Sequence, residues 1–285
     1  TTYHIAVYEY NNNSAGVPNY FTTAGTANTT TYNPTITTSV SSISSFGNVI
    51  VGNNSASQSY TVSATELSSS VTITAPTGFA ISLDDVDYSV NPIVLPKDGS
   101  DAVPTTTVYV RFSPGSANGA NSGNVTNTAT SATTKNVAVS GNAISLEPTT
   151  EGSISFGTVT GTSIIVNLPT VGNGSNRIIV VKAGSAPTAP ADASSYTANA
   201  SITSAGTTAA GSYVVYDGTG SGSSLVTVTG LTPSTTYYFA VYEYNLGTGS
   251  SQNYLTPSTV ILNQTTNAAS SATDQFRTAI TGNWN

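Results

Sequence analysis

Hydrophobic and polar residues alternate in short runs along this chain, and clusters of glycine, proline, asparagine and serine separate the runs. In the run VTIT, residues 71–74, apolar residues alternate with threonine, and in VYVRF the residues Val108, Val110 and Phe112 share one parity. A period of two is typical of strands that bury one face, because successive side chains point to opposite faces. The pattern predicts an all-β chain of tandem antiparallel β-sandwiches.

The first eleven residues, TTYHIAVYEYN, recur near the other end of the chain as TTYYFAVYEYN. Thr1 aligns with Thr235, and the alignment continues without a gap at an offset of 234 residues (235 − 1). Internal repetition on this scale indicates tandem modules. Residues 1–33 therefore correspond to the last two strands of a module whose complete copy covers 147–266, and we expect the chain to be a segment of a longer polypeptide.

The complete copy ends in a motif with a known counterpart. Six runs in it predict strands: SISFGTVT, SIIVNL, NRIIVVKAG, SYVVYDG, SLVTVTG and TYYFAVYEY. The segment LTPSTTYYFAVYEYN resembles the fibronectin type III pattern, with Leu231, Pro233 and Tyr237 at the corner that leads into the sixth strand. The resemblance implies a buried tyrosine whose hydroxyl bonds to nearby backbone. Family members usually carry a tryptophan in the second strand, where this chain has Leu168, and its single tryptophan is Trp284.

The middle of the chain, residues 34–146, predicts a second type of sandwich. Together its motifs resemble an immunoglobulin-like repeat that is frequent in long secreted and surface proteins of the Bacteroidota, and this implies structural roles for Phe46, Phe79 and Phe112. The remaining tail, 267–285, resembles the opening of a further module or a linker. The motifs of the middle region are FGNV (46–49), APTGFAIS (75–82), VYVRFSP (108–114) and VAVSG (137–141).

Composition narrows the classes of partner. Only 7% of the residues are charged and the net charge is −7, so hydroxyl and amide groups supply the polar surface. No apolar run approaches the roughly 18 residues of a membrane-spanning helix, and cysteine is absent. We expect neither nucleic-acid binding nor membrane insertion, because scattered basic residues cannot neutralise a row of phosphates. These residues are Lys97, Arg111, Lys135, Arg177, Lys182 and Arg277.

Candidate catalytic groups are few. His4 is the only histidine, and its counterpart in the complete copy is Tyr238, so the fold does not require an imidazole there. The acidic residues are mostly isolated in predicted loops, and the glycine-rich stretch 218–224 lacks the following helix that a phosphate-binding loop needs. The sequence therefore predicts no enzyme activity, no catalytic residue and no cofactor apart from a candidate calcium ion.

Two predicted turns carry clusters of aspartate. Asp84, Asp85 and Asp87 lie at one tip and Asp98 and Asp101 in another turn, and both offer oxygen ligands for calcium. The nine-residue segment YSVNPIVLP between them, read as a strand, separates the two turns by about 30 Å, so the five carboxylates cannot share one ion. Turn-forming and solubilising aspartate is the alternative interpretation.

A last set of candidates surrounds the matched motif AVYEYN. Glu9 and Glu243 lie near a strand end, where we expect them to face solvent, and the alternatives are a ligand contact or a bond across a module junction. The tyrosines are either core residues or rings that stack on sugars, which makes a surface polysaccharide one candidate partner. The candidates for contacts between molecules or modules are Tyr8, Glu9, Tyr10, Tyr242, Glu243, Tyr244 and Trp284.

These observations favour a structural and adhesive repeat segment of an extracellular bacterial surface fibre or adhesin, without catalysis. Its partners would be neighbouring copies or modules of the same protein, and the resemblance implies export by the type IX secretion route. One alternative is the subunit of a homopolymeric filament, in which a strand from a neighbouring chain completes residues 1–33. Another is a spacer or carbohydrate-binding accessory module of a secreted multidomain enzyme.

Overall fold

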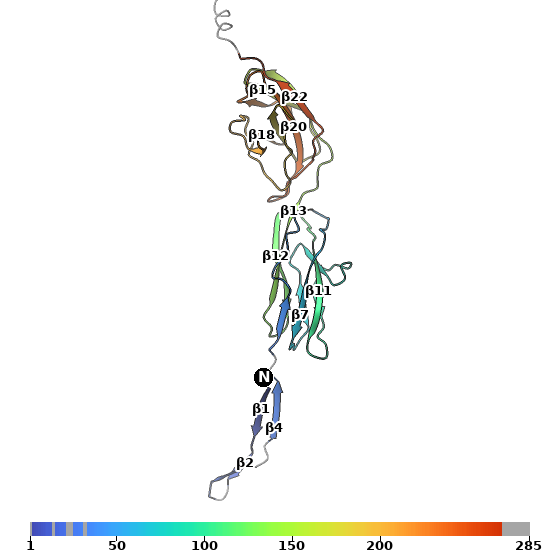
Figure 1. Ribbon diagram of the computed structural model, residues 1–285, viewed down its shortest axis with the longest axis vertical. Coiled ribbons are helices and arrows are strands. Elements are labelled where there is room, and N and C mark those ends of the chain that lie inside the picture. Colours follow the sequence, from blue (N-terminus) through green and yellow to red (C-terminus); the bar gives the residue numbers. More distant parts are fainter. Residues whose placement is uncertain (1, 13–14, 21–24, 31–32, 270–285) are drawn as a thin grey trace, which may run out of the picture. The chain divides into compact units, whose positions relative to one another are not determined.

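The computed structural model describes residues 2–12, 15–20, 25–30 and 33–269. In this part of the chain every regular element is a β-strand, and the strands pair mainly antiparallel (Figure 1). The prediction of an all-β chain of tandem sandwiches is therefore confirmed. By its contacts the chain divides into two compact units, one made of 1–44, 57–111 and 123–139 and the other of 45–56, 112–122 and 140–285. The predicted module boundaries do not coincide with this division and stay predictions.

The strands between residues 35 and 144 form two sheets. One sheet contains, in spatial order, β10 (Ile93–Leu95), β8 (Val71–Thr74), β12 (Gly119–Thr128), β13 (Lys135–Ile144) and β6 (Asn48–Ile50). The other contains β5 (Thr35–Thr38), β7 (Gln58–Thr65), β11 (Val103–Phe112) and β9 (Phe79–Ser82). The sheets face each other, because the Tyr60 hydroxyl on β7 donates a hydrogen bond of 2.9 Å to Asn127 Oδ1 on β12.

The predicted alternation in this sandwich is confirmed. Val71, Ile73, Val108, Val110 and Phe112 are all fully buried, and the residues between them are half-buried. The predicted strand over 88–96 is confirmed only in part, since β10 covers three of these residues, Ser89 forms an isolated β-bridge with Ile81, and the rest is bend and loop. Strand β12 was not predicted, because its sequence GANSGNVTNT has few residues that favour strands.

Burial of Tyr60 raises the pKa of its phenol to about 12, and the hydrogen bond to Asn127 acts in the opposite direction. In the unfolded chain the phenol has its ordinary pKa of 10.0, so between pH 10 and 12 the unfolded chain loses this proton more readily than the folded one. The free energy of unfolding is therefore unaffected by this group below pH 10 and falls as the pH rises toward 12. We expect Tyr60→Phe to reduce the loss of stability over that range, measured by urea unfolding at several pH values. An equal loss in both proteins would contradict the assignment.

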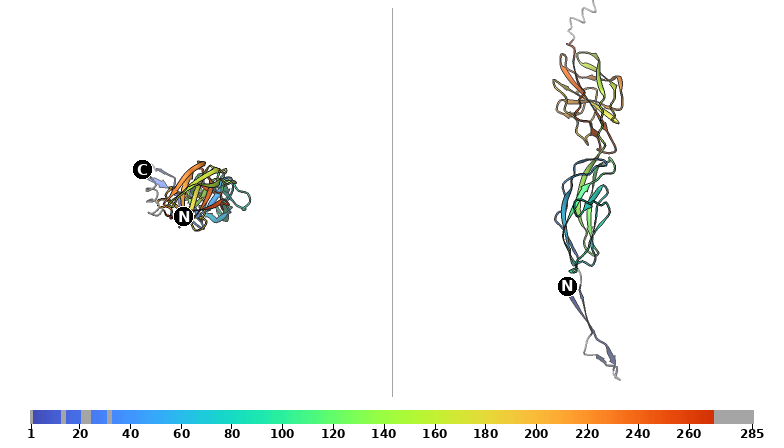
Figure 2. Two further views of the ribbon diagram at one scale, coloured as in Figure 1. Left: turned by 90° about the horizontal axis from the view of Figure 1, so that it is seen from above. Right: turned by 90° about the vertical axis from the view of Figure 1, so that its right-hand side faces the viewer.

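The strands between residues 153 and 265 form the second sandwich (Figures 1 and 2). Its smaller sheet contains β14 (Ser153–Val159), β15 (Ser163–Thr170) and β19 (Gly222–Thr229). Its larger sheet contains β17 (Thr207–Ala209), β18 (Ser212–Gly218), β16 (Asn176–Ala183), β20 (Thr236–Asn245) and β21 (Asn253–Tyr254), and β22 (Ile261–Thr265) also pairs with β20. The six strands predicted here are confirmed, and Leu168 lies fully buried in the core between the sheets.

Strand β20 is buried on both faces. One face, with Phe239 and Val241, packs into the core between the two sheets. The other face, with Tyr242 and Tyr244, packs against Ile178, Val180 and Val214, and Tyr196 from the long connection before β17 packs against the same cluster. This double burial explains why TYYFAVYEY reads as a nearly continuous apolar run, as expected for a strand covered on both sides.

The N-terminal segment repeats part of this arrangement. Strand β1 (Thr2–Val7) pairs with β4 (Gly25–Thr30), and β2 (Tyr10–Asn12) pairs with β3 (Pro18–Tyr20). The pair β2–β3 has the register of β20–β21. The pair β1–β4 differs from β20–β22 by one residue, since Thr2 lies opposite Thr30 whereas Thr236 lies opposite Thr265. Register is only weakly specified where no buried face constrains it.

Candidate functional site

The corner residues lie as the fibronectin type III resemblance implies. Leu231 and Tyr237 are buried, and the Tyr237 hydroxyl accepts a hydrogen bond of 3.0 Å from the backbone N–H of Thr232. The bond closes the turn between β19 and β20, and Pro233 lies inside this turn. The three residues therefore fix the start of β20, which carries the AVYEYN motif.

Removing this hydroxyl is expected to weaken the corner. Tyr237→Phe removes the acceptor of the Thr232 N–H from a partly buried hydrogen bond, and we expect a loss of about 1 kcal/mol in the free energy of unfolding. Tyr238→Phe is the matched control on the half-buried face of the same strand, with an expected change within about 0.5 kcal/mol. Urea unfolding of both variants measures the difference. Equal effects would show that the hydroxyl of Tyr237 has no special role.

Glu243 forms a buried ion pair with Arg177. Both carboxylate oxygens accept from Arg177 Nε, at 3.1 and 3.2 Å, and the two residues lie directly opposite each other on β20 and β16. Glu243 is 0% exposed and Arg177 4% exposed. The expectation that Glu243 faces solvent is therefore wrong. Sequence reasoning also missed Arg177, although a lone acid inside an apolar strand was a signal that a buried base must lie beside it.

The surrounding backbone completes the bonding of this ion pair. Arg177 Nη1 donates to the carbonyl oxygens of Thr219 and Gly220, at 2.6 and 3.1 Å. The N–H of Gly172 donates to Glu243 Oε1 at 2.8 Å, and a methyl group at that glycine would lie 2.7 Å from Glu243 Cγ. A buried ion pair is tolerated where such additional hydrogen bonds satisfy its remaining groups.

Tyr242 and Tyr244 are internal to the same sandwich. Burial raises the pKa of each phenol to about 12. The Tyr244 hydroxyl donates to Asp217 Oδ1 at 2.8 Å, and its ring lies 4.8 Å from the ring of Tyr254. The expectation that Tyr242, Glu243 and Tyr244 contact other molecules or modules is therefore wrong, because all three side chains are buried within their own module.

The corresponding residues of the N-terminal segment are exposed. Tyr8, Glu9 and Tyr10 all lie at the surface, and the rings of Tyr10 and Tyr20 lie 5.2 Å apart, in the same arrangement as Tyr244 and Tyr254. His4 is exposed too. Trp284 lies outside the described residues. Among the residues whose burial the structure describes, Tyr8, Tyr10 and Tyr20 are the exposed tyrosines, and their counterparts in the complete module are buried.

The first aspartate cluster is held by hydrogen bonds of its own loop. Asp84 Oδ1 accepts from the backbone N–H groups of Asp87 and Val86 and from the Ser82 hydroxyl, and these bonds lower the pKa of Asp84 to about 2. The Tyr88 hydroxyl donates to Asp85. The loop is therefore tied together by groups of the chain itself.

The second aspartate turn has its own partners. Asp101 forms an ion pair with Lys97, and Asp98 Oδ1 accepts from the N–H groups of Ser100 and Ala102. Among the described residues no group of three acidic, histidine or cysteine side chains lies close enough to hold a metal ion. The structure therefore does not bring the aspartates of either turn together in a group of three that could bind calcium.

The three structural phenylalanines differ in burial. Phe79 and Phe112 are fully buried, and Phe46 is half-buried. Phe112 packs against the backbone of Gly141, where an added methyl group would lie 2.6 Å from Phe112 Cδ1. The motifs VYVRFSP and VAVSG therefore meet in space, because the phenylalanine of the first occupies the room that the glycine of the second leaves.

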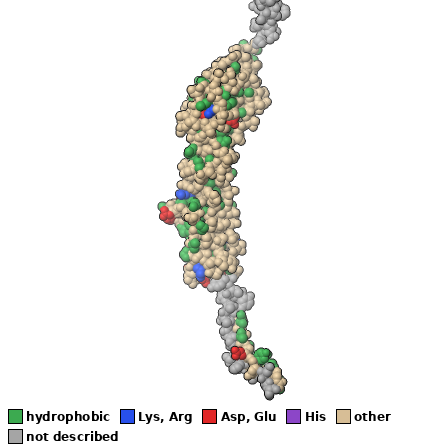
Figure 3. All heavy atoms as spheres, turned by 180° about the vertical axis from the view of Figure 1, so that it is seen from behind, with side chains coloured by type: hydrophobic (Ala, Val, Ile, Leu, Met, Phe, Trp, Pro, Cys, Tyr) green, Lys and Arg blue, Asp and Glu red, His purple; other side chains and the backbone are tan. Residues whose placement is uncertain are grey.

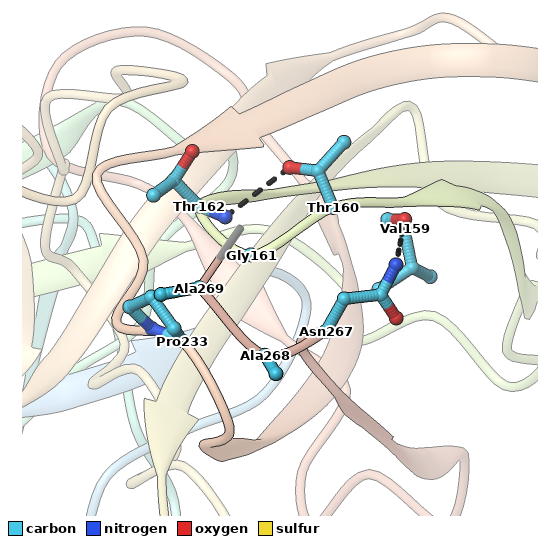
Figure 4. Close-up of a pocket in the computed structure, with 8 residues that line it drawn as sticks. All are labelled: Val159, Thr160, Gly161, Thr162, Pro233, Asn267, Ala268 and Ala269. Atoms are coloured by element: carbon cyan, nitrogen blue, oxygen red, sulfur yellow. Dashed lines mark hydrogen bonds between the residues drawn. The ribbon is translucent and has the colours of Figure 1, made fainter. Parts of the chain in front are cut away.

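A hollow of about 480 Å³ lies beside the corner (Figure 4). Its polar groups bond to one another, since Asn267 Nδ2 donates to the Val159 carbonyl at 2.8 Å and the Thr162 N–H to Thr160 Oγ1 at 3.2 Å. No charged side chain of the described chain lines it, so this hollow supplies no acid–base pair. Its lining consists of Val159, Thr160, Gly161, Thr162, Pro233, Asn267, Ala268 and Ala269.

A second hollow, of about 460 Å³, includes one acid, Glu151. The carboxylate accepts hydrogen bonds from the N–H groups of Thr259 and Val260, at 2.8 and 3.2 Å, and from the Thr259 hydroxyl at 2.6 Å. Through these bonds Glu151 helps to hold the segment that precedes β22.

No family model and no curated protein matches the chain in sequence. Among solved structures it is similar to chicken CNTN1 FN1–FN3 domains, at 13% identity and a TM-score of 0.33, covering 93% of this chain and 76% of that one. It is also similar to a two fibronectin type III domain segment from chicken tenascin, at 13% identity and a TM-score of 0.25, covering 72% and 92%. A Ca²⁺-stabilized adhesin of an ice-binding Antarctic bacterium has 12% identity and a TM-score of 0.25, covering 94% and 57%. In the described part of the chain no helix is long and apolar enough to cross a membrane.

Proposed function

We propose that this chain is a structural and adhesive segment of an extracellular array of β-sandwich modules, without catalytic activity. The supporting observation is that one strand unit occurs twice at a constant offset in sequence, and that its pairs β2–β3 and β20–β21 have the same register. Tyr10 lies opposite Tyr20 as Tyr244 lies opposite Tyr254, and the two ring pairs have centroid distances of 5.2 and 4.8 Å. A chain that repeats a packing unit is typical of modular arrays in which each unit folds around its own core.

The surface chemistry supports an extracellular and adhesive role. With 7% charged residues, the polar surface consists of hydroxyl and amide groups, which hydrogen-bond to sugars and to neighbouring protein without long-range charge selection. We propose neighbouring modules of the same protein as the principal partners and a surface polysaccharide as the candidate ligand. The resemblance to repeats of Bacteroidota surface proteins supports placing the chain at a bacterial cell surface.

The proposal is tested by electron microscopy of the native material together with its intact mass. We expect filaments or surface fibres built from a polypeptide far heavier than the 28.8 kDa of this chain. Compact particles of a secreted enzyme would overturn the proposal, because the sandwiches would then be spacers of a catalytic protein. Glycan-array binding of the purified chain tests the polysaccharide separately, with bovine serum albumin as the non-binding reference.

A homopolymeric filament is the second candidate function, and one observation favours it. Strand β1 has β4 on one side, and in the described part of the chain no other strand pairs with it. An uncovered strand edge is a template for a strand from another chain. In this case the same mass measurement would give filament subunits of about the mass of this chain.

A further inference from the structure

Arg111 is a half-buried cation whose hydrogen-bond donors have no acceptor. It lies near the end of β11, where Val108 and Val110 point into the core, so its own side chain lies on the outer face of the sheet. Its Nε is buried, and none of its nitrogens forms a hydrogen bond or an ion pair with a residue that the structure describes. Lys97 and Arg177, by contrast, each form an ion pair. An unpaired charged donor is costly, so this position favours a ligand oxygen.

The loop 83–90 holds a tyrosine ring against this arginine. The guanidinium carbon of Arg111 lies 4.1 Å from the centre of the Tyr88 ring, a distance at which a cation is attracted to the ring face. The Tyr88 hydroxyl donates to Asp85, and the hydrogen bonds of Asp84 close the same loop. Both carboxylates are thus bonded within the loop, and neither pairs with the arginine. The guanidinium is therefore positioned before a ligand arrives, which lowers the entropy cost of binding.

The neighbours of Arg111 on this face carry an aromatic ring and hydroxyl groups. Tyr109 lies two residues away on β11 and is half-buried, and Ser59 of β7 lies opposite it. The next outward pair consists of Thr107 and Thr61. All four residues alternate with buried ones, so they share the outer face with the arginine. Aromatic rings stack on the faces of sugars and hydroxyl groups bond to sugar hydroxyls, so this face combines sugar-recognising groups with a donor for an anion.

A single cation fits a ligand whose carboxylates are spaced apart. A planar carboxylate accepts two hydrogen bonds from a guanidinium, and such charge-assisted bonds are strong. Figure 3 shows few charged side chains on a surface that is mostly uncharged. With six basic residues scattered among 285, the chain has no row of cations for a polyphosphate or a strongly acidic peptide. A sugar polymer with one carboxylate on each sugar therefore fits this face better than either of them.

We propose that the outer face around Arg111 binds an acidic polysaccharide, with the guanidinium donating to the carboxylate of a uronic acid and Tyr109 packing against a neighbouring sugar ring. Tyr88 is a positioning residue, because it acts through the guanidinium that it holds. This inference rests on the proposed function and gives its polysaccharide ligand a chemical class and a site.

The test measures binding of the full chain to two polyuronates, polygalacturonate and alginate, and to fully methyl-esterified polygalacturonate, which has the same sugar backbone without the charge. We expect at least one polyuronate to bind about tenfold more tightly than the ester, and high ionic strength to reduce the difference. Arg111→Gln is expected to weaken this binding about tenfold and Tyr109→Thr about threefold. Lys135→Gln, a matched change at an exposed basic residue of the opposite sheet, should have no effect.

An NMR measurement on the unmodified chain makes the test independent of how well the variants fold. The Nε–H signal of Arg111 should shift when the polyuronate is added, because its guanidinium then gains an acceptor. The Nε–H signal of Arg177 is the internal reference, since that group already donates to Glu243 inside the second sandwich. We expect it to stay unchanged at every concentration of the polymer.

Three results would overturn the proposal. The methyl-esterified polymer could bind as tightly as the polyuronates, which would make the ligand a neutral sugar. Binding could be unchanged in Arg111→Gln, with no shift of the Arg111 signal. Neither polyuronate could bind, and binding of poly-glutamate in their place would identify an acidic protein as the partner. Each result leaves the mass and the microscopy of the native material unaffected, so failure of this site is distinguishable from failure of the proposed function.

Discussion

Arg177→Ala is expected to destabilise the second sandwich by about 3–5 kcal/mol, since it leaves the carboxylate of Glu243 buried without its charge partner. The N–H of Gly172 would remain as a hydrogen-bond donor to Glu243, but one neutral donor does not replace a guanidinium. Native-state hydrogen exchange read by mass spectrometry, on fragments from 153–265, gives the free energy of opening of this sandwich separately.

Two further variants show whether the loss of stability comes from breaking the ion pair or from substitution in general. Lys135→Ala removes an exposed basic side chain of the first sandwich, and its expected effect is within about 0.5 kcal/mol. The double variant Arg177→Met with Glu243→Leu removes both charges and should recover most of the lost stability. A loss below about 1 kcal/mol for Arg177→Ala would contradict the burial of the ion pair.

Phe239→Ala is expected to cost about 3–5 kcal/mol, the usual range for removing a large aromatic side chain from a core. Phe239 is fully buried between the two sheets, and its ring lies 5.1 Å from that of Phe156 in an edge-to-face arrangement. The truncation therefore removes a well-packed ring and leaves a cavity, which hydrogen exchange in β16 and β20 would report.

The chain contains its own control for this prediction. Ile5 has the same place in the repeat as Phe239 but is 51% exposed. We expect Ile5→Ala to change the free energy of unfolding by at most about 0.5 kcal/mol, because the side chain is already exposed to solvent. A loss as large as that of Phe239→Ala would contradict the exposure of Ile5.

Much of the fold could be predicted because local pattern and burial agree. Val71, Ile73 and Phe112 alternate with polar neighbours, and each apolar member is buried. Strand β12 could not be predicted, because its asparagine, glycine and threonine are held in the sheet by pairing with β8 and by the bond from Tyr60 to Asn127. For the segment 88–96 the prediction erred in the opposite way: its residues favour a strand, but most of the segment is bend and loop.

The sequence located the candidate contact residues in the motif AVYEYN, but it could not show which of them are buried and which are exposed. The repeat itself marked Glu9 and Glu243 as equivalent, and both were expected to face solvent. Whether such a residue is buried depends on the strand beside it, and that strand is separated in sequence by more than 60 residues from Glu243. Local pattern carries no information about such a neighbour.

The sequence by itself determined the fold class and the repeat, because strand periodicity and internal repetition are properties of the chain alone. The corner of Leu231, Pro233 and Tyr237 was located by the resemblance to the fibronectin type III pattern. Only the tertiary structure decided that Glu243 is buried against Arg177 while Glu9 is exposed, although both lie in the same six-residue motif. The motif is the same in both places, but a carboxylate can be buried only where a neighbouring strand supplies a positive charge. Arg177 of β16 supplies it for Glu243.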